Sequence, residues 1–261
     1  MKKVLCLLVC LLVLSPVTLV FAEKSSVQVY VSVSLREDRV PLALQKVTVT
    51  DADGDGVLSI ADALYAAHEV SFEGGAASGL SIQKTAYGLS MVKLWGVANG
   101  GSYGYYLNNA SPMSLADPVA DGDHVYTYCY TDTTTYSDTY CFFTQTACTA
   151  TVDSPLTLSI MSMGFDAAWQ PVSAPMAGLQ ITVDGVATQV VSAQDGSFTL
   201  SFDKPGTYRI SAQSADLVLV APLAQVVVSA ESAPVTGDRQ AYIAWLLLVS
   251  LAGLGLVLRY Q

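Results

Sequence analysis

Residues 51–62 read DADGDGVLSIAD. They follow the run VTVT, in which valines alternate with polar residues as in a half-buried strand, and they precede ALYAAHEVSF, in which apolar residues recur at helical spacing. Glycines at 74, 75 and 79 are expected to end this helix. The order of strand, acidic loop and helix predicts a domain that combines a sheet with a helix.

The helix after the loop has one apolar face. Ile60, Leu64 and Ala67 fall on it, with Val70 or Ser71 one turn further on. We expect His68 at the helix surface or in its cap, because neither His68 nor His124 is accompanied by the serine or cysteine pattern of a hydrolase. No reaction can be assigned from the sequence, so we expect a protein that is not an enzyme.

The acidic loop has oxygen-bearing residues at the spacing of a calcium loop of the EF-hand type. Such a loop takes ligands from positions 1, 3, 5, 7, 9 and 12, with glycine at position 6 and an aliphatic residue at position 8. Gly56 and Leu58 fill these last two positions when Asp51 is position 1. The predicted calcium ligands are Asp51, Asp53, Asp55, the Val57 carbonyl, Ser59 and Asp62.

An acidic surface turn that only caps the helix through Ser59 or Asp62 is the alternative for this loop. Such a turn has no need of Asp51, Asp53 and Asp55 together, because neighbouring carboxylates repel one another unless a cation offsets their charge. Magnesium demands a tighter octahedral shell than calcium. The pattern therefore favours calcium.

The two ends of the chain predict export and anchoring. Residues 1–22 begin with two lysines after the initiator methionine, continue through an apolar run and end in Val-Phe-Ala, which is typical of a secretory signal peptide. Residues 241–258 are uncharged and long enough to cross a membrane as a helix. We expect a secreted protein held at the cell surface by a transmembrane segment.

Residues 231–240 form a linker before this segment. Its sequence SAPVTGDRQ resembles the sortase sorting signal of Gram-positive surface proteins, with Pro234, Thr236 and Gly237 in place. The resemblance implies cleavage between Thr236 and Gly237 and attachment of the threonine to the cell wall. Because Ala233 stands where leucine is usual and the tail has a single arginine, simple membrane anchoring is the alternative.

The chain is acidic, with 12 Lys and Arg against 22 Asp and Glu. Nucleic-acid binding depends on a basic surface, so we expect no nucleic-acid partner. Only 13% of the residues are charged, whereas Thr, Ser, Tyr and Ala abound, which is a composition suited to exported β-domains.

Residues 80–144 contain short β-prone runs that predict two hairpins. The first lies in KLWGVANGGSYGYYLNN and turns at Asn-Gly-Gly, and the second joins DGDHVYTYCY to DTYCFF across 131–137. If Cys129 and Cys141 face each other in the second hairpin, they can form a disulfide; two free buried thiols fit equally well. With Cys148, the exported chain has an odd number of cysteines and no spacing of a zinc site.

The character of the chain changes at about residue 151. Short strands with Asp-Gly and Pro-Gly turns predict an Ig-like β-sandwich over 151–230. The stretch DGSFTLSFDKPGTYRISA resembles the Ig-like or prealbumin-like repeats of bacterial surface proteins, where such modules serve as spacers. The predicted strands are LTLSIMSM, LQITVDG, ATQVVS, GSFTLSF, GTYRISA, DLVLV and AQVVVSA.

Residues 47–144 resemble a domain of bacterial surface proteins related to the C-terminal domain of transcobalamin. YGLSMVKLWGV, YGYYLNNASPMSLADPVADGDHVYTYCY and YSDTYCFF carry the resemblance. An aromatic strand, an asparagine turn and a dGD motif match the family at Tyr105, Tyr106, Asn108 and 121–123. The resemblance implies a small β-grasp-like α+β domain, which we place at 23–150.

The same stretch supplies the candidate ligand-binding residues, because exposed aromatic rings stack on sugars or peptides. These candidates are Tyr103, Tyr105, Tyr106 and Asn108, with Tyr126, Tyr128 and Tyr130 on the neighbouring strand. The alternative is that alternate tyrosines pack the sheet while their hydroxyls reach water. We expect a calcium-stabilised binding or adhesion protein with an unidentified extracellular ligand: a glycan, a protein or a small molecule.

Two other functions remain open at this point. The loop and its Asp at position 12 resemble a dockerin repeat, which implies binding to a cohesin, although a dockerin has two such loops and this chain has one. Transcobalamin relatives hold a corrinoid between two domains, which implies small-molecule capture, although this chain has no helical partner domain.

Overall fold

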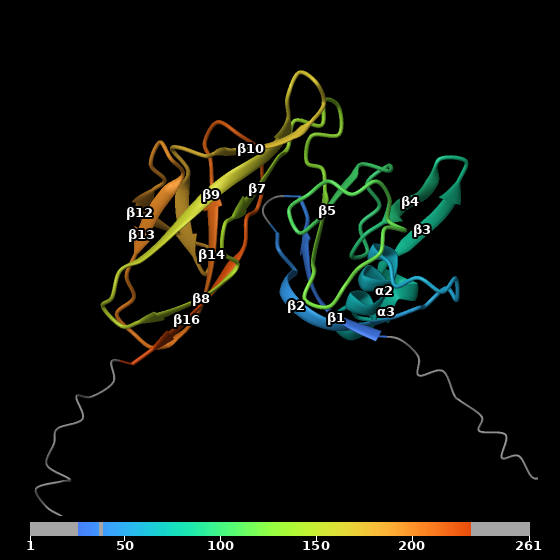
Figure 1. Ribbon diagram of the computed structural model, residues 1–261, viewed down its shortest axis with the longest axis horizontal. Coiled ribbons are helices and arrows are strands. Elements are labelled where there is room, and N and C mark those ends of the chain that lie inside the picture. Colours follow the sequence, from blue (N-terminus) through green and yellow to red (C-terminus); the bar gives the residue numbers. More distant parts are fainter. Residues whose placement is uncertain (1–25, 37–38, 231–261) are drawn as a thin grey trace, which may run out of the picture.

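The computed structural model of the protein describes residues 26–36 and 39–230 (Figure 1). The predicted signal peptide, the sorting motif at Pro234, Thr236 and Gly237, and the apolar segment 241–258 lie outside this part of the chain. Within the described residues, no helix has the length and apolarity needed to cross a membrane.

The N-terminal body is a mixed four-stranded sheet with helices on one face. The strand order is β2-β1-β6-β5, in which β1 is antiparallel to β2 and parallel to β6. A separate hairpin is formed by β3 and β4. The elements are β1 (Ser26–Ser34), β2 (Leu42–Thr50), α2 (Ile60–Ser71), α3 (Gly75–Gly79), β3 (Ser81–Thr85), β4 (Gly88–Lys93), β5 (Tyr103–Leu107) and β6 (His124–Cys129).

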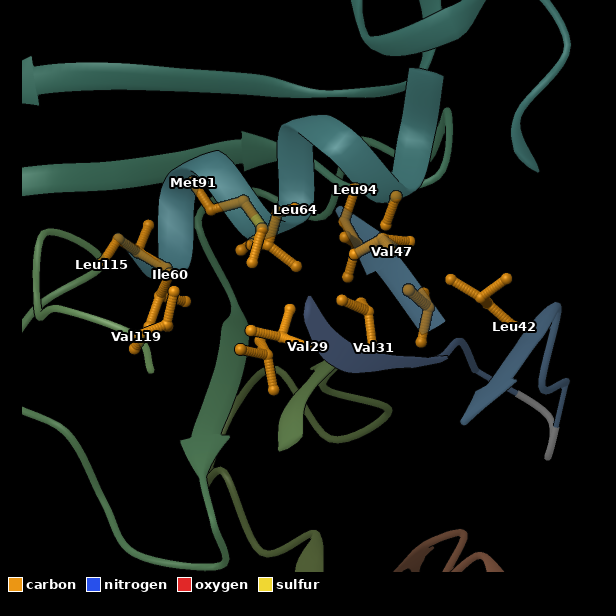
Figure 2. Close-up of a cluster of buried hydrophobic side chains, with 14 of the residues drawn as sticks. Val29, Val31, Leu42, Val47, Ile60, Leu64, Met91, Leu94, Leu115 and Val119 are labelled. Carbon is orange, nitrogen blue, oxygen red and sulfur yellow. The ribbon is translucent and has the colours of Figure 1, made fainter. Parts of the chain in front are cut away.

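The core of this body lies between α2 and the sheet (Figure 2). Alternate valines of β1 and β2 face Ile60 and Leu64 of α2, which are fully buried as the helical spacing predicts. Val70 is exposed, so the apolar face is shorter than expected and ends at Ala67 and His68. Burial of a leucine or isoleucine side chain contributes about 2 kcal/mol, so this face is enough to hold α2 on the sheet.

The expectation that His68 lies at the surface is wrong, because the histidine is fully buried. Its ring lies beside Phe72 and Trp95. Nδ1 lies 2.6 Å from the Leu64 carbonyl oxygen, and Nε2 accepts a hydrogen bond from the Trp95 backbone N–H. The neutral imidazole can make both of these hydrogen bonds, so burial leaves neither ring nitrogen unpaired.

The C-terminal body consists of two sheets packed face to face. One has the order β10-β9-β7-β15, with β13 also paired to β9, and the other has the order β12-β11-β14-β16-β8. Side chains of both sheets form one core. The strands are β7 (Thr139–Phe143), β8 (Ala147–Thr151), β9 (Leu156–Phe165), β10 (Pro171–Pro175), β11 (Gln180–Val183), β12 (Val186–Val191), β13 (Ser197–Leu200), β14 (Gly206–Gln213), β15 (Leu219–Val220) and β16 (Ala224–Ser229).

All seven strands predicted after residue 151 are present, as β9 and β11 to β16. The structure adds β8 and β10, and it changes the partners of β7. We expected β7 to form a hairpin with β6 inside a domain that ends at 150. Instead β7 pairs with β9 and β15, and β8 pairs with β16, so both strands complete the sandwich of the C-terminal body.

The other predicted hairpin is also wrong. β4 pairs with β3, and β5 pairs with β6, which follows it after the connection 108–123. Asn108 and Asn109, both of positive φ, form a tight turn at the start of this connection that brings Leu107 opposite Ala110. The Asn-Gly-Gly segment at 99–101 does turn the chain, with the Ser102 N–H donating to the Asn99 carbonyl. A tight turn fixes only the local direction, and the partners of the strands it connects depend on the sheet they join.

The two bodies meet through an aromatic interface. Tyr126 and Tyr128 of β6, together with Tyr140 of β7, are buried there against Val220 and Leu223. The ring of Tyr106 stacks on that of Tyr140 with centroids 3.6 Å apart. The Tyr126 hydroxyl donates to the Ala221 carbonyl, and the Tyr140 hydroxyl donates to Asn109 Oδ1 at 2.8 Å. The bodies are therefore joined by both packing and hydrogen bonds.

Gly104 makes room for this interface, and its replacement tests it. A Cβ at Gly104 would collide with the ring of Tyr128, whereas a Cβ at Gly164 of β9 would meet nothing within 4 Å. We expect Gly104→Ala to lower the free energy of unfolding by about 1–3 kcal/mol through overpacking. Urea denaturation measures the loss, and Gly164→Ala is the matched control. Equal stability of both variants would contradict the packing described.

Acid should weaken the N-terminal body through His124. Burial lowers the pKa of His124 to about 4, and its Nε2 lies 2.9 Å from the Ser32 hydroxyl. Because the folded state disfavours the charged imidazole, stability is fully present above the unfolded pKa of about 6.5 and is lost as pH falls towards 4. Each pKa unit corresponds to about 1.4 kcal/mol. Urea titrations at pH 7 and pH 4.5 should show a larger loss for the native chain than for His124→Gln.

Candidate functional site

The acidic loop turns sharply at two glycines and orients the first of its carboxylates. Gly54 and Gly56 have φ of +80° and +89°, which turn the chain sharply at the fourth and sixth positions. Asp51 Oδ1 accepts the N–H groups of Gly54 and Asp55, and Asp51 Oδ2 accepts that of Gly56. Burial opposes the effect, but these hydrogen bonds hold the pKa of Asp51 below its ordinary value. The backbone of the loop thus fixes the orientation of the Asp51 carboxylate.

Three of the predicted ligands converge. One carboxylate oxygen each of Asp51, Asp53 and Asp55 lies within 4.8 Å of the others. Asp53 and Asp55 are exposed, so a hydrated ion can reach them. Hard oxygen donors at this spacing fit calcium, which takes six to eight oxygen ligands at about 2.3–2.6 Å.

Ser59 and Asp62 have a different role in the structure. They form a capping box at the start of α2, in which Ser59 is the N-cap and Asp62 the third helical residue. Asp62 Oδ2 accepts the Ser59 N–H and hydroxyl, and Oδ1 accepts the Ala52 N–H at 2.9 Å. Asp62 is 4% exposed. Both carboxylate oxygens of Asp62 accept hydrogen bonds within the protein. Ser59 and Asp62 therefore form the helix cap that was the alternative interpretation of this loop.

The exit of the loop is attached to a distant segment. The Val119 N–H donates to the Leu58 carbonyl at 2.8 Å, and the N–H groups of Ile60 and Ala61 donate to the carbonyls of Asp117 and Leu115. Leu115 and Val119 also enter the core beneath α2 (Figure 2). Residues 115–119 therefore hold the exit of the loop in place.

A groove of about 390 Å³ lies beside the loop. Asp53 and Asp62 stand at its edge, and Tyr65, Leu80 and Leu89 are among the residues that line it. Tyr65 is 45% exposed, so its ring is accessible from the groove. The geometry would allow a small, largely apolar group next to an ion in the loop.

The predicted tyrosine face does not exist as one surface. Tyr103 and Tyr105 point into the core beneath α2, and the Tyr103 hydroxyl accepts the Asn99 N–H. Tyr106 points the other way, into the interface between the bodies, where burial raises its pKa to about 12. The reason is the period of two in a strand: neighbours on β5 face opposite sides of the sheet.

Asn108 has a structural role just after β5, where it contacts the start of β6. Its Nδ2 donates to Asp123 Oδ1 at 2.7 Å, and its Oδ1 accepts the His124 N–H at 2.9 Å. In the dGD motif, Asp121 accepts the Gln28 N–H, and Gly122 has φ of +87°. Asn108 and the motif thus fasten β5 and β6 to β1.

The three cysteines of the described chain are free and buried. Cys129 belongs to β6 in the N-terminal sheet and Cys141 to β7 in the sandwich. The disulfide considered for this pair depends on a β6–β7 hairpin that does not form. Burial raises the pKa of Cys129 to about 11, so the thiol is protonated and unreactive at neutral pH.

One signal in the sequence could have identified the interface. In HVYTYC every residue except Thr127 is apolar or aromatic, on both alternating sets of positions, which indicates a strand covered on both faces. β6 has this property, since Val125 and Cys129 lie in the core beneath α2 and Tyr126 and Tyr128 in the interface.

No protein-family model matches the chain, and no curated protein matches it. Among solved structures, the tandem Ig repeats of Dlar match with 14% identity over 58% of this chain and 75% of that chain, at a TM-score of 0.26. The Ig1-2 module of the Drosophila receptor protein tyrosine phosphatase DLAR matches with 14% identity over 59% and 76%, at 0.24.

The four N-terminal Ig domains of Dscam1 isoform 4.44 match with 13% identity over 57% of this chain and 32% of that chain, at a TM-score of 0.23. Likenesses at these scores carry no argument about fold or function. The account of the C-terminal body rests on its own strand pairing and core.

The capping role of Asp62 can be separated from metal binding. In the presence of a chelator, we expect Asp62→Ala to lower the free energy of unfolding by about 1–2 kcal/mol, because the Ser59 and Ala52 N–H groups lose their acceptor. Glu73→Ala, at an exposed residue just after α2, is the control and should change stability by less than about 0.5 kcal/mol. Urea denaturation measures both. An effect of Asp62→Ala that appears only with calcium would make it a ligand and not a cap.

Proposed function

We propose that the protein is a calcium-stabilised binding or adhesion protein of the cell surface. The observation that carries the proposal is the convergence of Asp51, Asp53 and Asp55 in a loop with two glycines of positive φ. The Val57 carbonyl and water would complete the shell, and Asp62 could join it only by giving up part of the cap. Calcium would offset the repulsion among the three carboxylates and fix the entry to α2.

The architecture proposed for this function has two parts. A β-grasp-like assignment of the N-terminal body is supported by the order β2-β1-β6-β5, with β1 parallel to β6 and α2 crossing one face. An Ig-like assignment of the C-terminal body is supported by its two packed sheets, in which all pairs are antiparallel except β7 with β15 and β8 with β16. Export, the sorting motif and the anchor at 241–258 belong to the proposal on sequence grounds alone.

A binding role is favoured over catalysis by the state of the two histidines. Burial lowers the pKa of both His68 and His124, and both ring nitrogens of His68 and Nε2 of His124 are engaged by protein groups. Neither imidazole is available to a substrate as a base. The two histidines therefore serve the packing and hydrogen bonding of the fold.

The two alternative functions lose support from the geometry. A dockerin pairs two calcium loops, whereas this loop is paired with residues 115–119. Corrinoid capture was expected beside the tyrosines, and these are buried in the core or the interface. We therefore propose neither.

Calcium binding is tested by thermal unfolding of the chain with calcium and with chelator. One thousandfold excess of calcium over its dissociation constant would add about 4.1 kcal/mol, and a concentration equal to it about 0.4 kcal/mol. We expect a higher melting temperature with calcium, and no such shift in the double variant Asp51→Asn, Asp53→Asn. Asp203→Asn, at an exposed residue of the C-terminal body, is the control. An unchanged melting temperature on chelation of the native chain would exclude the calcium site.

A further inference from the structure

Six exposed apolar side chains gather at one end of the C-terminal body. They come from the segment before β7, from the β9–β10 connection with the adjoining strand residues, and from the segment before β15. Trp169 is the most exposed, at 80%, and the others are exposed to between 40% and 53%. We call this surface the apical patch; it consists of Tyr136, Phe165, Trp169, Val172, Leu217 and Val218.

The strand register brings these loops together. Cys141 of β7 lies opposite Ser162 of β9, so continuing the antiparallel register places Asp138 beside Phe165. β15 runs parallel to β7 with Leu219 opposite Thr139, and the Thr139 N–H donates to the Val218 carbonyl at 2.8 Å. The loops at 131–138, 165–172 and 214–218 therefore leave the sheet at the same end.

The apical patch lies away from the end of the described chain. Ser229 of β16 is opposite Thr151 of β8, which leads by a short turn into the start of β9. Phe165 is the last residue of β9, whose 10 residues span about 30 Å. In Figure 1 the β9–β10 hairpin forms the upper end of this body, and β16 ends at its lower edge. A C-terminal anchor would thus leave the patch facing outward.

The patch has an acidic rim and no basic residue. Asp132, Asp138, Asp166 and Asp216 lie in the three loops, and the chain has no lysine or arginine between Lys93 and Lys204. Hydrogen bonds from Thr135 and Ser137 hold the pKa of Asp132 far below its ordinary value. Asp166 is fixed in its turn by the N–H groups of Ala168 and Gln170. Each of the three loops therefore carries negative charge beside its apolar side chains.

We propose that the apical patch docks a protein segment whose apolar side chains are flanked by lysine or arginine. The proposal rests on the surface-binding function proposed above and names the class of its partner. Apolar area supplies affinity at the centre of such a contact, and the acidic rim selects a cationic partner. Trp169 and Phe165, whose ring centroids lie 6.2 Å apart, offer faces to a cation. An anionic membrane or nucleic acid would be repelled by the same rim.

The test uses the full chain and three immobilised synthetic peptides of equal length. One alternates leucine with lysine, one alternates leucine with glutamate, and one alternates serine with lysine. We expect the leucine–lysine peptide to bind at least tenfold more tightly than either of the others in surface plasmon resonance. Its affinity should fall as salt concentration rises, because the contact includes exposed charges.

Variants locate the contact on the protein. Trp169→Ala and Leu217→Ala should each weaken binding of the leucine–lysine peptide by at least fivefold. Both side chains are exposed, so the variants should keep the native melting temperature. Tyr87→Ala, at a fully exposed tyrosine between β3 and β4, is the matched control and should stay within twofold of the native affinity.

Three outcomes would overturn the proposal. The first is equal binding of the leucine–glutamate peptide, and the second is peptide binding that both Trp169→Ala and Leu217→Ala leave unchanged. The third is that the native chain binds a neutral oligosaccharide and not the peptide, and that Trp169→Ala abolishes this binding. The calcium-dependent melting shift is measured on the same samples. If the shift is present and peptide binding absent, only the apical patch is wrong. If the peptide binds at the patch without the shift, calcium stabilisation is wrong and the docking surface stands.

Discussion

Strand β6 is buried on both faces, and the rest of the structure depends on this constraint. One face closes the core beneath α2, and the other is covered by the C-terminal body. Tyrosine suits the second face, because its ring packs while its hydroxyl still finds an acceptor, as that of Tyr126 does at the Ala221 carbonyl. The two bodies are joined at the centre of the molecule and not only through the chain between them.

The acidic loop is coupled to this centre through residues 115–119. Their hydrogen bonds fix the loop exit, their apolar side chains enter the core, and the chain continues directly into β6. A change at Asp51 or Asp53 can therefore reach the sheet through a short path of backbone contacts. This coupling explains how a single calcium loop, if occupied, would act on the stability of the N-terminal body and need no partner loop.

The aromatic residues fall into two groups, those that stabilise the fold and those that are exposed to a partner. Most tyrosines at 103–130 are committed to the core or the interface, and the hydroxyls of Tyr103 and Tyr126 bond to protein groups. Three exposed aromatics, Tyr136, Phe165 and Trp169, stand at the end of the sandwich, where a rigid scaffold holds them. Loops tolerate changes in sequence without loss of the sheets beneath them, so this end of the body can adapt to a partner.

The sequence alone determined the local elements. Alternating valines predicted β1 and β2, helical spacing predicted Ile60, Leu64 and Ala67 as the buried face of α2, and turn residues predicted the seven strands after 151. The loop from Asp51 to Asp55 was equally readable, because its glycines and carboxylates act within a few residues of one another.

The tertiary structure decided which strands pair and which faces are free. Nothing local assigns β7 to the sandwich, Asp62 to the helix cap or Tyr106 to the interface, because each depends on a partner far away in the sequence or on competition between two uses of one side chain. His68 was misjudged for the same reason, since its buried partner Trp95 comes from another element. Pairing and burial are set by the free energy of the whole packed chain, and a sequence window contains only part of it.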